Sequence, residues 1–195
     1  MVNVGIIGIG YWGPNLVRNF SLVSNCLVIA VADQSAERLK QFSRLYPNIK
    51  SYKHADDLIT DNDIDAVIIA TPVFTHFDLA RRALMQGKHV LLEKPMTSTA
   101  IEAEILIGLA TQKNLLLMVD HTFLYTGAVQ KMKCLIEDGE LGKIKYLDST
   151  RINLGLFQPD INVLWDLAPH DISILNYIIA EQPYSVNATG TTHTN

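Results

Sequence analysis

Cysteine is scarce in this 195-residue sequence, which contains only Cys26 and Cys134. Two isolated cysteines have neither the density of a secreted disulfide scaffold nor the close spacing of a zinc knuckle, so we expect reduced thiols. The sequence also lacks His, Cys and carboxylate groups at metal-ligand spacing. We therefore predict no metal site.

Long apolar runs and an excess of basic charge are missing as well. No apolar stretch approaches the roughly 18 residues of a membrane span, and Met1 leads into a strand pattern without a basic leader. The 16 basic residues face 20 acidic ones, so the net charge of -4 offers no basic stripe to a polyanion. The sequence predicts a cytoplasmic protein that binds neither membranes nor nucleic acid.

What the sequence does contain is apolar residues, 48% of the chain, in an alternation of strand and helix patterns up to about residue 120. Continuous apolar runs predict buried strands, and the amphipathic segments between them predict helices. The strands are expected at 2–8, 27–33, 64–70, 89–93 and 115–119, and the helices from Pro14 and at 36–45, 77–86 and 99–112. This alternation predicts an α/β fold of the Rossmann type, a doubly wound parallel sheet.

The pattern changes after Asp120. A helix at 128–137, a strand at 144–152, an irregular loop at 153–164, a buried helix at 170–179 and a strand at 184–190 follow. We predict a Rossmann domain of residues 1–122, followed at 123–195 by the start of an α+β second domain whose sheet is incomplete.

A glycine motif, Gly8-x-Gly10-x-x-Gly13, directly follows the first strand and opens the first helix, with Tyr11 and Trp12 inside it. This is the context that a dinucleotide-binding turn requires. The first glycine permits the turn, the second lets the backbone approach a pyrophosphate, and the third packs helix on strand. The motif predicts that residues 1–122 bind a dinucleotide.

Asp33 lies at the end of the second strand, 20 residues after Gly13. A carboxylate there accepts hydrogen bonds from the ribose diol of NAD and repels the 2′-phosphate of NADP. The neighbouring Gln34 and Ser35 offer no cation to bind that phosphate. The sequence predicts NAD as the cofactor, with NADP disfavoured.

Two further strand ends carry candidate groups. Thr71 and Pro72 close the third long strand and are expected to border the nicotinamide or its ribose. His76 is a candidate for the same site, or a brace for the first turn of its helix.

Glu93 and Lys94 directly follow a buried strand, and Pro95 fixes the exit of the chain. Lys94 is suited to polarise a reacting hydroxyl, with Glu93 beside the cofactor; the alternative is a solvated ion pair at a strand end.

Asp166 and His170 are four residues apart, so both face one side of a helix. An imidazole held near a carboxylate can accept the proton of a substrate hydroxyl. The alternative is that Asp166 caps the helix and His170 is a core histidine.

Taken together, these residues resemble the glucose-fructose oxidoreductase and inositol dehydrogenase family, Gfo/Idh/MocA, over the whole chain. The stretches that carry the resemblance are GIIGIGYWGPNLVRNF at 5–20, Asp33, ATPVFTH at 70–76, GKHVLLEKP at 87–95, EDGELGKI at 137–144 and WDLAPHDISIL at 165–175. The resemblance implies hydride transfer between a nicotinamide and a secondary alcohol of a sugar or cyclitol. The family's active-site positions match Lys94, Asp166 and His170, and its members often have a cis peptide at Lys94-Pro95.

The resemblance extends to a subgroup associated with polysaccharide and nucleotide-sugar pathways. It makes Arg151, Asn153 and Asn162 candidates for substrate contacts, with structural roles in an irregular loop as the alternative. The chain departs from the family where many members have an Asn-Arg pair and this sequence has His121-Thr122, so we expect His121 near the nicotinamide.

Full members of the family are longer, and their second-domain sheet commonly forms a homo-oligomer interface. The resemblance therefore predicts an NAD-dependent oxidoreductase with a small sugar, cyclitol or nucleotide-sugar substrate, and leaves the oligomeric state of this chain open. The alternative is a non-catalytic NAD-binding module or a truncated, inactive relative.

Overall fold

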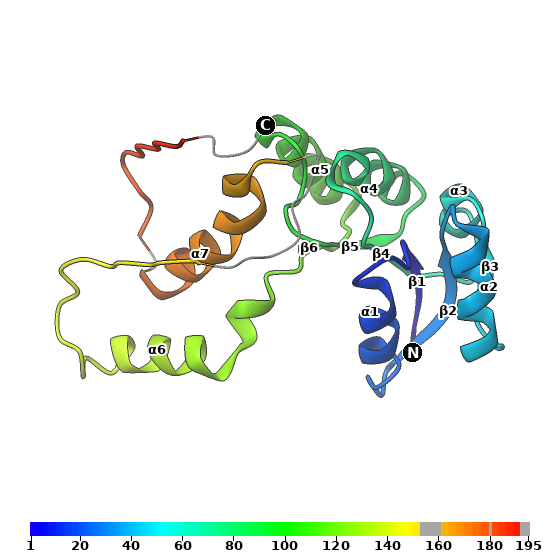
Figure 1. Ribbon diagram of the computed structural model, residues 1–195, viewed down its shortest axis with the longest axis horizontal. Coiled ribbons are helices and arrows are strands. Elements are labelled where there is room, and N and C mark those ends of the chain that lie inside the picture. The colour runs from blue at the N-terminus through cyan, green and yellow to red at the C-terminus, as the bar shows by residue number, and fades with distance from the viewer. Residues whose placement is uncertain (153–160, 180, 192–195) are drawn as a thin grey trace.

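A six-stranded parallel sheet forms the centre of the first part of the chain in the computed structural model, which describes residues 1–152, 161–179 and 181–191 (Figure 1). The strand order is β3-β2-β1-β4-β5-β6. The strands are β1 Val2–Ile7, β2 Cys26–Ala32, β3 Lys50–Tyr52, β4 Ala66–Ile69, β5 His89–Leu92 and β6 Leu117–Val119. This order is that of dinucleotide-binding folds, and it confirms the predicted fold class.

Helices cover both faces of the sheet. Two separate clusters of buried apolar side chains show which helix packs where: α1 and α2 contribute to one cluster, and α3, α4 and α5 to the other. Their bounds are α1 Gly13–Phe20, α2 Ala36–Leu45, α3 Ala55–Ile59, α4 His76–Met85 and α5 Ala100–Lys113. Because each helix buries its apolar stripe against the sheet, the carboxyl ends of the strands are held as one rigid edge.

Beyond β6 the only regular secondary structure in the described part of the chain is helical. A 3-10 turn at Thr122–Tyr125 leads into α6, Gly127–Glu137, and then α7, Val163–Ile179. The two helices are joined by a hydrogen bond of 3.0 Å from the Tyr177 hydroxyl to Gln130 Oε1, and Figure 1 shows them at the opposite end of the molecule from β3. Among the described residues, no helix is long and apolar enough to cross a membrane.

The predicted strands at 144–152 and 184–190 are wrong. Residues 144–152 and 184–190 form no strand, and most of them are exposed. A strand is stable only where a neighbour accepts its backbone hydrogen bonds, and the described part of the second half supplies no such neighbour.

The helix predicted as buried at 170–179 is longer and less buried than expected. It begins at Val163 instead of residue 170, carries Pro169 inside it, and buries fully only Ile178. Of the predicted loop at 153–164, residues 153–160 lie outside the described part of the chain, and Val163 and Leu164 belong to α7 instead of a loop.

Candidate functional site

The glycine turn between β1 and α1 requires the absence of side chains at two positions. Gly8 has a φ of 93°, and a Cβ on it would lie 2.6 Å from the carbonyl oxygen of Ala70. A Cβ on Gly13 would lie 2.2 Å from the carbonyl oxygen of Gly8. At Gly10 the nearest atom to such a Cβ would be Arg38 Nη1 at 3.8 Å, an ordinary van der Waals distance, so nothing crowds this glycine. The turn is thus packed on one side and leaves the helix N-terminus open on the other, which suits a bound pyrophosphate.

Asp33 ties this turn to the end of β2. Its Oδ2 accepts a hydrogen bond of 2.9 Å from the backbone N–H of Ile9, and its Oδ1 accepts one of 2.8 Å from Ser35. The side chain is only 7% exposed. Each carboxylate oxygen has a second lone pair, so both can also accept a hydrogen bond from a ribose hydroxyl.

Arg38 is a cation that the sequence interpretation missed. Its Nη1 lies 3.6 Å from Asp33 Oδ2, and the side chain is 56% exposed. The prediction considered only Gln34 and Ser35, the residues next to Asp33 in sequence. Ser35 caps α2 by accepting a hydrogen bond from the N–H of Arg38, and the first turn of this helix brings the guanidinium back over Asp33.

A cleft of about 960 Å³ runs from Asp33 to the loop after β5. It is lined by most of the residues that the sequence singled out. These are Gly8, Gly10, Tyr11, Trp12, Asp33, Thr71, Pro72, Glu93, Lys94 and Asp166. Gly13 does not line the cleft. The cleft joins the first two glycines of the motif to Lys94.

His76 is buried beneath this cleft and does not line it. Its Nε2 lies 2.8 Å from the carbonyl oxygen of Thr71, and its Nδ1 lies 3.0 Å from that of Pro95. The imidazole therefore connects the end of β4 to the loop that carries Lys94. Direct contact of His76 with the cofactor stays a prediction.

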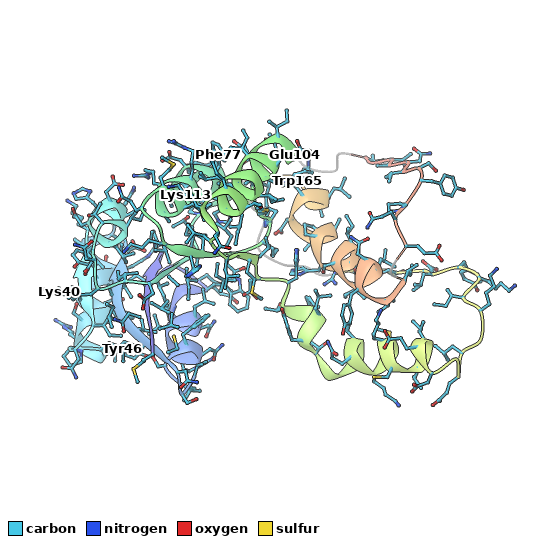
Figure 2. The ribbon with its side chains drawn as sticks, turned by 180° about the vertical axis from the view of Figure 1, so that it is seen from behind. Lys40, Tyr46, Phe77, Glu104, Lys113 and Trp165 are labelled. Carbon is cyan, nitrogen blue, oxygen red and sulfur yellow. The ribbon has the colours of Figure 1, made fainter. Side chains whose placement is uncertain are left out.

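Lys94 is held by the second half of the chain. Its ammonium donates a hydrogen bond of 2.8 Å to Asp166 Oδ1 and one of 2.9 Å to the carbonyl oxygen of the same residue. The peptide bond from Lys94 to Pro95 is cis, as predicted. One residue earlier on α7, Trp165 Nε1 donates to the carbonyl oxygen of Thr97 at 2.9 Å, and Figure 2 shows Trp165 at this junction. The start of α7 is thus fixed against the loop after β5.

His170 lies one turn further along α7. Burial lowers the pKa of its imidazole to about 4, and the positive charges of Lys94 and Arg151 act in the same direction. Its Nδ1 is buried without a hydrogen-bond partner among the described residues. We expected Asp166 to orient this imidazole, but the hydrogen bonds that Asp166 accepts come from Lys94. His170 is instead packed against the ring of Phe123, edge to face, with centroids 4.8 Å apart.

The three candidate substrate residues have different positions. Arg151 is bound to Asp171 by two hydrogen bonds, of 2.6 Å from Nε and 3.1 Å from Nη2, and its guanidinium lies over Phe123. Asn162 Oδ1 accepts a hydrogen bond from the N–H of Trp165 and so caps α7, the role considered for Asp166. Asn153 lies outside the described residues. Substrate contacts by all three stay predictions.

Glu93 is paired with a second carboxyl group that the sequence interpretation missed. Burial, and then the neighbouring charge of Asp120, raise the pKa of Glu93 to about 7. Burial also raises the pKa of Asp120, and burial lowers the pKa of the adjacent His121. The signal was present in the sequence, because Asp120 directly follows β6 as Glu93 directly follows β5.

The site offers ligands to a dinucleotide rather than to a metal. Within the described ranges, no three His, Cys, Asp or Glu side chains are grouped so that they could hold a metal ion. The glycine turn, the helix N-terminus and the carboxylate of Asp33 match the needs of a pyrophosphate and a ribose diol. A six-stranded sheet in this order with this turn defines the class of dinucleotide-binding proteins.

Comparison with known proteins agrees with this class and narrows it. The sequence model of the Gfo/Idh/MocA group, described as an oxidoreductase family with an NAD-binding Rossmann fold, matches residues 2–121. The chain belongs to this family, as its resemblance implied.

The relatives are longer than this chain. UDP-N-acetylglucosamine 3-dehydrogenase of Acidithiobacillus ferrooxidans is 31% identical over 97% of this chain and 58% of its own length. Myo-inositol 2-dehydrogenase of Thermotoga maritima is 25% identical over the same shares of the two chains, 97% and 58%. The crystal structure of a probable dehydrogenase from Thermotoga maritima, 24% identical, superposes with a TM-score of 0.81 over 93% of this chain and 56% of that one. The chain therefore spans just over half the length of these proteins.

Proposed function

We propose that this chain supplies the cofactor domain and the catalytic groups of an NAD-dependent dehydrogenase that acts on a secondary alcohol of a sugar, cyclitol or nucleotide sugar. The observation that carries the proposal is the ion pair of Lys94 and Asp166 on the cleft that also contains Asp33. The names of the two curated relatives, a nucleotide-sugar dehydrogenase and an inositol dehydrogenase, support the substrate class.

The cofactor would be held by the glycine turn, Asp33, Thr71 and Glu93, and when bound it supplies a hydride acceptor. The protein's own groups would accept the proton of the substrate hydroxyl and stabilise the negative charge that develops on its oxygen. Lys94 presents its ammonium to the cleft and can donate a hydrogen bond to that oxygen. Asp166 fixes the direction of the ammonium through two acceptor atoms.

His170 is the candidate acceptor of the hydroxyl proton. Because its pKa is held near 4, the imidazole is neutral at pH 7 and has a lone pair to offer. A positioned group of this kind typically contributes about 10²- to 10⁴-fold in rate.

Turnover of a panel of sugars, inositols and UDP-sugars tests the proposal, with NAD reduction followed by absorbance. We expect Lys94→Ala and His170→Ala to lower kcat by about 10²-fold or more while NAD binding measured by calorimetry is kept. Lys40→Ala is the matched control, since Lys40 is an exposed lysine on α2 away from the cleft (Figure 2).

Two results would contradict the proposal. One is NAD binding without turnover of any member of the panel, which favours a non-catalytic module. The other is full turnover by both variants, which removes Lys94 and His170 from the mechanism. The division at residue 122, a cytoplasmic location and a homo-oligomeric state of the full-length family members stay predictions.

A further inference from the structure

The position of Glu93 in the cleft follows from the sheet order. Asp33 ends β2 on one side of the glycine turn, and Glu93 follows β5 on the other side, two strands away from β1. In this fold the dinucleotide lies across the carboxyl edge, with its adenosine ribose at the end of β2. The nicotinamide half must then extend along the cleft towards β4 and β5, where Thr71 and Glu93 line the wall.

Asp120 stands directly behind Glu93. Strands β5 and β6 are paired in parallel with Leu92 opposite Val119, so the next residues along, Glu93 and Asp120, leave neighbouring strands at the same level. The backbone N–H of Asp120 donates to the carbonyl oxygen of Leu92 at 2.8 Å, which fixes this register. The two side chains are hydrogen-bonded to each other and both are half-buried.

Two carboxyl groups this close in a half-buried place do not both ionise easily at neutral pH, because the second negative charge is repelled by the first. Glu93 is the partner that keeps the proton, since its pKa is raised to about 7; burial also raises the pKa of Asp120, but the hydrogen bond with Glu93 opposes that rise. The other charged or titratable neighbours are Lys94 beside Glu93 and His121 beside Asp120. Asp166, on α7, already balances Lys94.

We infer that Glu93 and Asp120 form a one-proton carboxyl pair that supplies the counter-charge for the nicotinamide ring, so that Asp120 is a further specificity-determining residue of the cofactor site. The nicotinamide ring is a cation in the oxidised cofactor and neutral in the reduced one. A cation beside Glu93 favours its ionised form, whereas a neutral ring does not. The pair therefore favours oxidised over reduced cofactor, and does so more strongly as the pH rises. This inference rests on the proposed NAD binding.

By linkage, binding of NAD⁺ releases part of a proton from the pair, and binding of NADH does not. We expect the Kd for NAD⁺ to fall about three- to tenfold between pH 6 and pH 8, below the one-proton ceiling of tenfold per pH unit, while the Kd for NADH stays flat. Titration calorimetry in buffers of different ionisation enthalpy measures both the Kd and the proton release on the unmodified chain.

Substitution of Glu93 should remove this pH dependence, and substitution of Asp120 should reduce it. In Glu93→Gln, the titrating proton is gone. In Asp120→Asn, the repelling charge is gone but burial still acts on Glu93, so the pKa of Glu93 falls and less of its titration lies between pH 6 and pH 8. Glu104→Gln, which changes an exposed carboxylate on α5 (Figure 2), should keep the wild-type dependence. Thermal unfolding of each variant establishes that it is folded.

The outcomes separate this inference from the function on which it rests. NAD⁺ binding with the same Kd at pH 6 and pH 8, an equal pH dependence for NADH, an unreduced dependence in a folded Asp120→Asn variant, or a dependence kept in a folded Glu93→Gln variant would each overturn the carboxyl pair alone. Failure of the wild-type chain to bind either form of the cofactor would overturn the proposed function as well.

Discussion

At the scale of single residues, the site depends on close backbone contacts as much as on side-chain chemistry. Gly13 and Gly108 show the difference, because both lie in helices and differ only in what surrounds them. A Cβ on Gly13 meets the carbonyl oxygen of Gly8, whereas a Cβ on Gly108 in α5 has nothing within 4 Å. Only the first glycine is required by packing.

This contrast predicts opposite effects of the same substitution. Gly13→Ala should lower the free energy of unfolding by about 2–3 kcal/mol, since backbone must shift to admit the methyl group. Gly108→Ala should raise it by up to about 1 kcal/mol, because alanine is the better helix former. Thermal or urea unfolding checks both. A Gly13→Ala variant as stable as wild type would show that the turn is not constrained as described.

The second residue-scale prediction concerns Asp33 and Arg38. In Asp33→Ser, the charge that repels a 2′-phosphate is gone and Arg38 is released from its ion pair. Arg38 can then donate a charge-assisted hydrogen bond to the 2′-phosphate of NADP. Such a hydrogen bond contributes about 1.5–3 kcal/mol, so NADP should bind about tenfold or more tightly.

The double variant Asp33→Ser with Arg38→Ala should lose this gain, whereas Lys40→Ala in the same background should keep it. Calorimetry with NAD and with NADP provides the ratio of the two Kd values. Tight NADP binding in the double variant would mean that another group binds the phosphate.

The third residue-scale prediction follows from His170. Its folded pKa of about 4 lies below its ordinary value of 6.5, so the neutral form is favoured by folding. The corresponding stability is present above about pH 6.5 and is lost as the pH falls towards 4. His170→Asn should therefore lose less stability than wild type between pH 7 and pH 5 in urea unfolding. His54→Asn, which removes an exposed histidine, is the control. Parallel curves for His170→Asn and wild type would contradict the assignment.

At the scale of elements, the sequence predicted what hydrophobic periodicity can report. Strands β1, β2, β4 and β5 and helices α1, α2, α4 and α5 were found because they bury apolar side chains in a regular pattern, and the half-buried β6 was found because residues 115–119 form an apolar run. Strand β3, Lys50–Tyr52, was missed because it contains no apolar run, and helix α3, Ala55–Ile59, was missed because five residues are too short to show a period.

Pairing is the second property that the sequence pattern did not report. Residues 144–152 and 184–190 have the composition of strands, but a strand also needs a partner, and partners are a property of the fold. The same limit explains which site residues the sequence pattern revealed. Lys94, Asp33 and the glycine turn were found in their local motifs. Arg38 reaches Asp33 only through the first turn of α2, and Asp120 meets Glu93 only because β5 pairs with β6.

The contact of α7 with the loop after β5 gives an element-scale prediction. Trp165→Phe removes the hydrogen bond to Thr97 and keeps an aromatic ring. Loss of this hydrogen bond should lower the local stability of α7 by about 1 kcal/mol. Amide exchange in the first turns of α7 should then be about fivefold faster, and exchange in α5 should be unchanged. Tyr184→Phe, at a fully exposed position, is the control. Equal exchange rates in Trp165→Phe and wild type would show that this hydrogen bond does not hold the helix.

At the scale of the whole molecule, the two halves are built differently. Both clusters of buried apolar residues lie in the first part of the chain, with Leu117 as the last residue packed against them. Beyond β6, Val129 and Ile178 are the buried apolar residues in the described part, and α6 and α7 expose much of their surface. The first half therefore has a complete core of its own, as a predicted domain of residues 1–122 requires.

This difference predicts the course of limited proteolysis by trypsin. The segment that follows α6 has neither helix nor strand through residue 152 and carries the exposed Lys143 and Lys145, so cleavage should begin there. Lys40 and Arg44 are equally basic but lie within α2 on the sheet, and should be cut much more slowly. Mass spectrometry should show an early fragment that ends at residue 143 or 145 and contains all six strands. Early cuts in α2 at comparable rates would mean that the sheet half has no independent stability, and the predicted boundary near residue 122 would then be wrong.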